Sequence, residues 1–226
     1  MEKVTIFLAD WQALLREGIH FTLSGEEDID VIGEATNNED ALAFIENNPP
    51  RIAILSADRG KISGIDATRS IKQNLPSVAV ILLMESDNEE QIFSAMKSGV
   101  SACLPKDIDP DELVNITMNI AQGGQPISEA LLRPELASRV LDEFEAFSLI
   151  SKQVDDLLAR LSPTEAALLR CIAGGSSGEQ LTQTLAITEK AIRRHLGLIL
   201  SKLVANARNR EMIEAAQKGT INNSSN

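Results

Sequence analysis

Cysteine is scarce in this chain of 226 residues, which contains only Cys103 and Cys171. Because the two are far apart and fall in different predicted domains, they are typical of reduced core thiols and argue against a disulfide framework or a redox pair. Histidine is limited to two residues as well, and no second ligand lies at a suitable spacing from His195 to form a metal site. We therefore predict no metal and no cofactor.

Motifs of enzymes and of membrane proteins are also missing. The sequence has no paired carboxylates, no nucleophile with a base at catalytic spacing and no phosphate-binding loop, so an enzyme is the least favoured class of function. The apolar run from Val78 to Met84 is far shorter than the roughly 20 residues that cross a bilayer. The start, Met1-Glu2-Lys3, lacks the pattern of a signal peptide. We expect no membrane segment and a cytoplasmic location.

Positive charge is in the minority, and the formal net charge of −12 disfavours a nucleic-acid partner, because affinity for DNA comes largely from neutralising phosphates. The distribution of charge changes this interpretation. Residues 1–160 carry −15, whereas residues 161–226 carry +3. The asymmetry favours an acidic regulatory domain joined to a mildly basic domain that contacts DNA, although two unrelated surface compositions would give the same values.

Short apolar runs alternate with helical patterns in the N-terminal half. The strand-like runs are residues 4–9, 29–32, 52–55, 78–83 and 102–104, and the helical patterns that follow the second to fifth runs are 38–47, 65–73, 89–97 and 110–122. This alternation predicts a doubly wound α/β domain, with a five-stranded parallel sheet covered on both faces, over residues 1–125. In such sheets functional groups gather beyond the carboxyl ends of the strands, here at Asp10, Ser56, Met84 and Lys106.

Residues 126–160 form a predicted helical linker with a heptad pattern. Apolar residues occupy seven of the eight a and d positions, which are Ala137, Val140, Phe144, Phe147, Ser151, Val154, Leu158 and Leu161. Such a seam is typical of a coiled coil. It predicts a homodimer joined through Phe144, Phe147, Val154 and Leu158. The alternatives are a linker helix that packs on its own domain, and a dimer formed through the N-terminal domain.

Residues 161–219 carry the signals of a helix-turn-helix. Ser162, Pro163 and Glu165 predict a helix that begins with a capping box, and Gly174-Gly175 ends it. A scaffold helix over 179–185, a turn at Ala186-Ile187 and a second helix from Thr188 to about Leu203 follow. The second helix presents cations on one face, as a helix that enters a major groove does. A last helix is expected over 211–216, and residues 220–226 are predicted to be disordered.

This segment, with LSPTE at its start, a GGSS loop, ITEKAIRRHL and a final SKL, resembles the LuxR-type four-helix DNA-binding domain of the NarL/FixJ family. The resemblance implies double-stranded DNA as the partner. By it, the base-facing positions are Arg193, Arg194 and Gly197, and the phosphate-facing positions are Thr188, Lys190, Lys202 and Arg208. Two residues depart from the family pattern. Gly197 costs about 1 kcal/mol inside a helix and provides no side chain, and Val204 replaces a glycine, so the turn after it is expected to differ.

The N-terminal part resembles the receiver domain of a response regulator in three segments: TIFLADWQALLREGI, RIAILSADRGKISGIDA and KSGVSACLPKD. Such a receiver uses two acids to hold a divalent cation, an aspartate nucleophile, a hydroxyl that senses the phosphoryl group and a lysine. Asp10 and Lys106 retain two of these groups. The other three positions hold Trp11, Ser56 and Met84.

These replacements predict a pseudo-receiver. An indole offers Mg²⁺ no oxygen ligand, the Ser56 hydroxyl cannot form an acyl phosphate, and the Met84 thioether offers a phosphoryl group no hydrogen bond. We expect an Asp10–Lys106 ion pair in place of the metal. Asp58 would be a displaced acceptor without most of its partners, and Trp11 would be either a core plug or the lining of a ligand pocket.

The combined prediction is a DNA-binding transcription regulator that acts without conventional aspartyl phosphorylation. A small ligand or a protein partner would then act on the pseudo-receiver. The competing hypothesis is a protein-interaction module with weak or no DNA binding. Binding of duplex DNA above the nonspecific background distinguishes the two.

Overall fold

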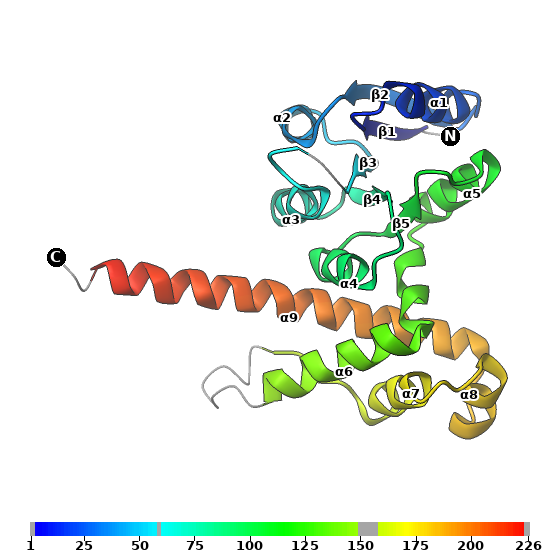
Figure 1. The fold of residues 1–226 in the computed structure, drawn as a ribbon, viewed down its shortest axis with the longest axis vertical. Helices are drawn as coiled ribbons and strands as arrows, with labels where there is room; N and C mark the ends of the chain where they lie inside the picture. Colours follow the sequence, from blue (N-terminus) through cyan, green and yellow to red (C-terminus); the bar gives the residue numbers. More distant parts are fainter. Residues whose placement is uncertain (1–2, 58–59, 149–157, 224–226) are drawn as a thin grey trace. The chain divides into compact units, whose positions relative to one another are not determined.

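The computed structural model describes residues 3–57, 60–148 and 158–223, which form two compact units, residues 1–127 and 128–226 (Figure 1). Asp58, the displaced acceptor of the sequence analysis, and Val154, a predicted dimer residue, lie outside the described residues. None of the described helices has the length and apolar character that a membrane crossing requires.

The first unit is built on a parallel sheet of five strands in the order β2-β1-β3-β4-β5. The strands are β1 (Val4–Ala9), β2 (Ile29–Ala35), β3 (Ile52–Ser56), β4 (Ala79–Met84) and β5 (Ala102–Pro105). The helices are α1 (Ala13–Ser24), α2 (Asn38–Asn47), α3 (Gly64–Asn74), α4 (Glu89–Ser98) and α5 (Pro110–Ala121). The predicted doubly wound α/β fold is confirmed.

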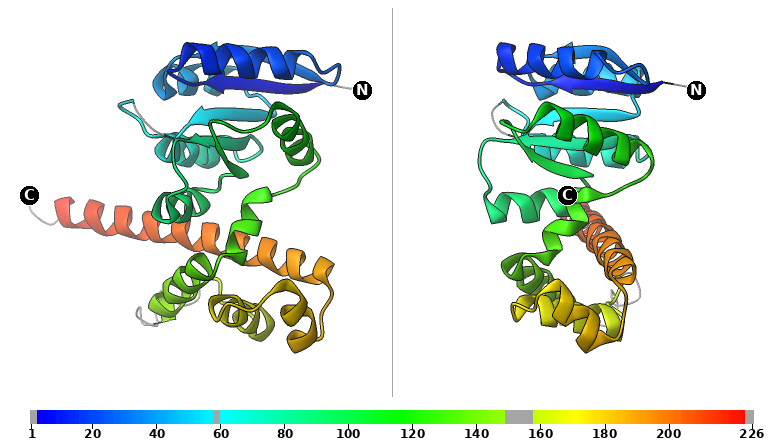
Figure 2. Two further views of the ribbon diagram at one scale, coloured as in Figure 1. Left: turned by 45° about the vertical axis from the view of Figure 1, so that its right-hand side comes forward. Right: turned by 90° about the vertical axis from the view of Figure 1, so that its right-hand side faces the viewer.

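Both faces of this sheet are covered, because its strands are apolar on both sides. On one face, Ile19 and Leu23 of α1 and Leu113 of α5 pack against a cluster of strand residues. Helices α2, α3 and α4 lie next to one another along the other face (Figure 2). With both faces covered, the carboxyl edge of the sheet is left for the functional groups.

The second unit contains the helix-turn-helix. Its elements are η1 (Pro126–Leu132, whose first two residues belong to the first unit), α6 (Pro134–Ser148), α7 (Pro163–Ala173), α8 (Gly178–Leu185) and α9 (Glu189–Asn223). The predicted capping box is present: the Ser162 hydroxyl accepts from the Glu165 amide, and the Glu165 carboxylate accepts from the Ser162 amide. Leu181 of α8 and Ile192, Leu196 and Ile199 of α9 are buried between the helices, whereas Leu185 and Ile187 are half-buried.

The first half of the predicted heptad seam is buried within the second unit. Helix α6 packs along α7 of the same unit, and Ala137, Val140 and Phe144 are already buried there. Helix α6 is described as far as Ser148, and Leu158 lies outside any helix. Phe147 belongs to α6. Phe144 is therefore a core residue of one chain, and the predicted linker is part of the second unit.

Two helices that were predicted separately, over 188–203 and 211–216, form one helix in the structure. Helix α9 runs without interruption for 35 residues, through Val204, where the family pattern has a glycine and a turn. A β-branched residue disfavours the left-handed conformation that such a turn uses, so the helix continues. It also continues over 220–223, which were predicted as part of a disordered tail.

Candidate functional site

The carboxyl edge of the sheet brings Asp10 and Lys106 together. Asp10 follows β1 and is buried, and its Oδ2 lies 2.8 Å from Lys106 Nζ beyond β5. The other carboxylate oxygen of Asp10 accepts a hydrogen bond of 2.7 Å from the Gln12 amide. The expected ion pair is present. Both oxygens of Asp10 are therefore engaged by groups of the chain itself.

Trp11 covers this ion pair from outside. Lys106 Nζ lies 5.4 Å from the centroid of the indole ring, a favourable cation–π distance. The side chain is 40% exposed, so the prediction of a core plug is wrong. Sequence reasoning could not decide this, because an indole fits both a core and a surface that shields a cation.

Ser56 and Met84 are both buried at the ends of their strands. The backbone around Ser56 is tightly enclosed: a Cβ atom on Gly64 would lie 2.4 Å from the Ser56 carbonyl oxygen. Asn38 Nδ2 donates to that oxygen and to the Ile62 carbonyl, both at 3.1 Å. Sequence reasoning missed Asn38, whose signal was a polar residue in the first turn of an otherwise amphipathic helix.

The divalent cation of a receiver does not fit this edge. Trp11 offers no oxygen ligand, Ser56 offers a hydroxyl in place of a carboxylate, and the Asp10 carboxylate is engaged by an ammonium group. Within the described residues, no three His, Cys, Asp or Glu side chains gather in a way that could hold a metal. The described groups at this edge form an ion pair, and the position of the phosphoacceptor holds the Ser56 hydroxyl, which cannot form an acyl phosphate.

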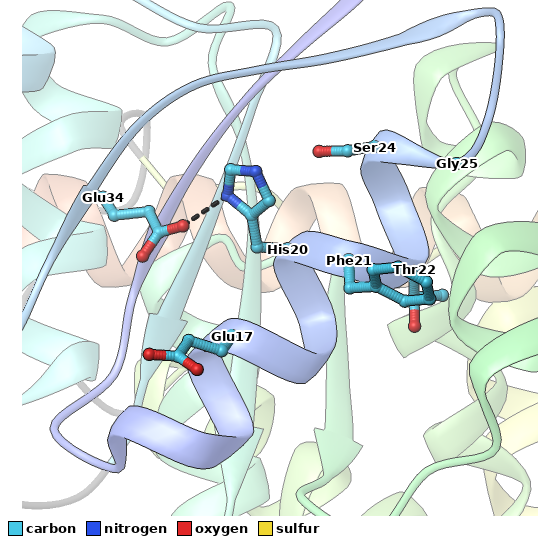
Figure 3. A pocket seen from close by; sticks show the side chains of 7 residues that line it. All are labelled: Glu17, His20, Phe21, Thr22, Ser24, Gly25 and Glu34. Atoms are coloured by element: carbon cyan, nitrogen blue, oxygen red, sulfur yellow. Dashed lines mark hydrogen bonds and ion pairs between the residues drawn. The ribbon is translucent and has the colours of Figure 1, made fainter.

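A pocket of about 660 Å³ lies elsewhere, on the outer side of α1 and β2 (Figure 3). Its lining comprises Glu17, His20, Phe21, Thr22, Ser24, Gly25 and Glu34. His20 Nδ1 interacts with Glu34, which also accepts from Arg16 Nε at 2.9 Å. Trp11 is not part of this lining, so a pocket at Trp11 remains only a prediction.

The second set of predicted residues lies on the first half of α9. Thr188 caps the helix, because its hydroxyl accepts from the Ala191 amide at 3.2 Å. Lys190, Arg193 and Arg194 are exposed in the next two turns, and Arg208 is exposed further along. Arg193 Nε lies 3.8 Å from Glu129 of η1, in a pair whose side chains are both mostly exposed. Except for Gly197, which has no side chain, the predicted base-facing residues are exposed cations on one helix.

Lys202 forms an ion pair within the domain. Its Nζ lies 2.6 Å from Glu165 Oε2, and the Glu165 side chain is only 3% exposed. Burial by itself raises the pKa of Glu165, but hydrogen bonds from Lys202 and Ser162 and the charge of Lys202 outweigh it, so the pKa lies below its usual value. Lys202 therefore links α9 to α7, and its contact with a DNA phosphate stays a prediction.

The Asn206 side chain also connects α9 to the segment before α7, through hydrogen bonds to the backbone of Ala159. Its side chain is fully buried, and it accepts from the Ala159 amide at 2.7 Å and donates to the Ala159 carbonyl at 2.9 Å. Together with Lys202, it fixes α9 against the chain that leads into α7. The cations at the start of α9 are thus held on a rigid support.

Comparisons with known proteins agree with both parts of the chain. Residues 6–118 match the response regulator receiver domain, and residues 159–216 match the luxR family of bacterial regulatory proteins. The chain is 28% identical to the uncharacterized transcriptional regulatory protein YxjL of Bacillus subtilis, over 97% of this chain and 98% of YxjL. It is 28% identical to the nitrate/nitrite response regulator NarL of Escherichia coli, over 95% and 94% of the two chains. The structure of the RcsB response regulator of Salmonella typhimurium aligns with a TM-score of 0.52 at 22% identity, over 90% of this chain and 93% of RcsB.

Proposed function

This chain belongs to the NarL/FixJ response regulators, in which a receiver domain precedes a LuxR-type DNA-binding domain, and we propose that it binds specific sites in duplex DNA without being switched by aspartyl phosphorylation. Its homologues support the general function, a DNA-binding regulator of transcription. Such a protein works on chromosomal DNA, so we propose a cytoplasmic location and no enzymatic activity of its own.

The observation that carries the DNA-binding proposal is the exposed, cationic first half of α9. In helix-turn-helix proteins the N-terminal residues of the recognition helix contact base edges. Arg193 and Arg194 lie in the second turn of α9, where a guanidinium can donate two hydrogen bonds to guanine. Thr188, Lys190 and Arg208 are proposed to contact phosphates. Helix α8 supports α9 through the buried Leu181.

The test is sequence selection from a random duplex library, followed by titration of the selected site at stated salt. Arg193→Ala and Arg194→Ala should each lower the affinity for this site by about 5- to 150-fold, the effect of losing about 1–3 kcal/mol. Lys190→Ala serves as the matched control, because loss of a phosphate contact weakens all sequences about equally and lowers the salt slope by about one. Selection of no sequence at all would favour a protein-interaction module instead.

The proposal of phosphorylation-independent control rests on the Asp10–Lys106 pair. A phosphoryl group shifts a receiver only if it interacts differently with two conformations. Lys106 is already paired with Asp10, and the side chains of Trp11 and Met84 offer a phosphoryl group no oxygen or hydroxyl. Another input, a protein partner or a small ligand at the receiver, would then have to provide the control.

We also propose a homodimer through the receiver, because Ala137, Val140 and Phe144 of the heptad seam are buried within one chain. Leu14 and Phe21, seven residues apart on the outer side of α1, are 86% and 83% exposed. A paired apolar surface of this kind is a common contact between copies of a chain. Sedimentation at tens of micromolar should give a dimer for the native chain and a monomer for Leu14→Glu/Phe21→Glu. Ala43→Glu on the exposed side of α2 is the control and should leave the dimer intact.

A further inference from the structure

One exposed apolar side chain lies on the proposed recognition surface and has no role there yet. Leu198 of α9 is 42% exposed, although its neighbours Leu196, Ile199 and Leu200 are almost completely buried. Burying an apolar side chain of this size contributes a few kcal/mol at most, and the exposed part of Leu198 contributes none of this to the fold. That part of the side chain is therefore available to contact another molecule.

The position of Leu198 relates it to the arginines. Residues four apart are neighbours on a helix surface, so Leu198 lies directly after Arg194 along the exposed side of α9. Leu198 thus continues the side of the helix on which Arg194 lies.

Two positions close to Leu198 offer no free side-chain donor to a base. Gly197 has no side chain, and a Cβ atom placed there would meet nothing within 4 Å. The Ser201 hydroxyl, one turn further on, donates to the Gly197 carbonyl of its own helix at 2.9 Å. After the two arginines, the helix therefore presents an open backbone position and one apolar group.

The major groove presents one apolar group on its base edges, the C5-methyl of thymine. We propose that Leu198 contacts a thymine methyl and so determines part of the sequence specificity, while Gly197 lets the backbone of α9 approach the bases closely. One helical turn rises about 5.4 Å and one base pair about 3.4 Å, so this thymine lies one to two base pairs from the base that Arg194 contacts. The inference rests on the proposed function, and it names a base that the arginines do not read.

The experiment removes the methyl group alone. In the duplex selected with the full chain, each thymine is replaced in turn by deoxyuridine, and the affinities of the native chain and of Leu198→Ala are measured. At one thymine the native chain should lose about fourfold, the value of burying one methyl group. Leu198→Ala should bind the thymine duplex more weakly by at least that factor and be insensitive to deoxyuridine at that position.

Two controls make the outcome specific. Met212→Ala removes another exposed apolar side chain of α9, beyond the proposed groove, and should leave affinity unchanged. Leu198→Ala should keep the native slope of affinity against salt, because no phosphate contact is removed, and its circular dichroism and melting temperature should match the native chain.

The possible outcomes distinguish a failure of the proposed function from a failure of the thymine contact alone. If no sequence is enriched over nonspecific binding, the proposed function fails and the inference fails with it. If sequences are enriched but deoxyuridine affects the native chain and Leu198→Ala equally at every thymine, only the thymine contact is overturned. A loss at one position in the native chain that is absent in Leu198→Ala supports it.

Discussion

The ammonium group of Lys106 lies 2.8 Å from the buried carboxylate of Asp10, and the indole of Trp11 covers the ammonium group. The Glu85 carboxylate lies 3.9 Å from the same ammonium group. Lys106 is thus the cation that faces two acids at the edge of the sheet.

The Asp10–Lys106 pair should stabilise the receiver. Lys106→Met leaves Asp10 buried without a cation, and we expect the free energy of unfolding to fall by about 3 kcal/mol. Asp10→Leu/Lys106→Met removes both charges and should recover most of that loss. Trp11 is the only tryptophan, so its fluorescence during urea denaturation reports this domain. Lys61→Met, at an exposed position, should change little, and an equal loss in the single and double variants would contradict the role of the pair.

Acetyl phosphate or beryllofluoride with Mg²⁺ should neither modify the receiver nor change DNA affinity. Ser56 cannot form the acyl phosphate, and the groups that would sense it are replaced. Intact mass and DNA titration measure the two effects. Trp11→Asp/Ser56→Asp/Met84→Thr restores the missing groups and is the positive control. A stoichiometric adduct on Asp58 or Asp10 with a tenfold change in affinity would show a displaced but working switch.

Low pH should lower the free energy of unfolding of the DNA-binding domain, because Glu165 becomes protonated. Because the pKa of Glu165 is lowered in the folded state, its contribution is complete above the unfolded value of about 4.3 and is lost as the pH falls through the folded pKa. Lys202→Met should reduce the unfolding free energy at pH 7 by about 2 kcal/mol, less than for a fully desolvated pair because Lys202 stays 28% exposed. In Glu165→Gln, the free energy of unfolding should fall less steeply as the pH is lowered than in the native chain. A native profile that is flat from pH 6 to pH 3 contradicts this.

Glu129 should compete weakly with DNA for Arg193. The pair is 3.8 Å apart and exposed, so it stabilises the free chain by at most about 1 kcal/mol. Glu129→Gln should therefore tighten DNA binding by up to about fivefold at low salt, and the gain should disappear as salt rises. Glu135→Gln removes the same charge from α6 and is the control. Equal gains in both variants would indicate a general effect of charge.

Ala186→Gly should stabilise the helix-turn-helix. Ala186 ends α8 in the left-handed conformation, with φ of 52°, and is the one non-glycine residue of the described chain with positive φ. Glycine adopts this conformation freely, so we expect a gain of about 1 kcal/mol in thermal unfolding. Ala191→Gly, inside α9, should lose about the same amount. Loss in both variants would mean that the turn is not strained.

Sequence predicted the receiver fold well, because apolar strands and amphipathic helices each carry their own periodicity. It also predicted the meeting of Asp10 and Lys106, because the carboxyl ends of parallel strands share one edge. The exposure of Trp11 depends on a rotamer and on the position of Lys106, and no periodicity encodes either. The buried Ser56 and Met84 lie where the strand pattern placed them.

The second domain shows what a pattern leaves open. A heptad pattern predicts that one face of a helix is buried, but it does not identify whether α7 or a second chain covers that face. Lys202 lies on the border between the buried and exposed sides of α9, where helical periodicity cannot separate an interior ion pair from a phosphate contact. Val204 was recognised as a departure, but the continuous helix became evident only in the structure.

Because α9 is continuous, the end that is proposed to contact DNA and the C-terminal end belong to a single helix. At 35 residues the helix is about 52 Å long, and no hinge separates Arg193 from Met212. A domain with a turn at this point could let its last helix swing while its recognition helix stayed in the groove. In this chain, a force applied to α9 beyond Ala207 is transmitted through the continuous helix to the end that carries the arginines.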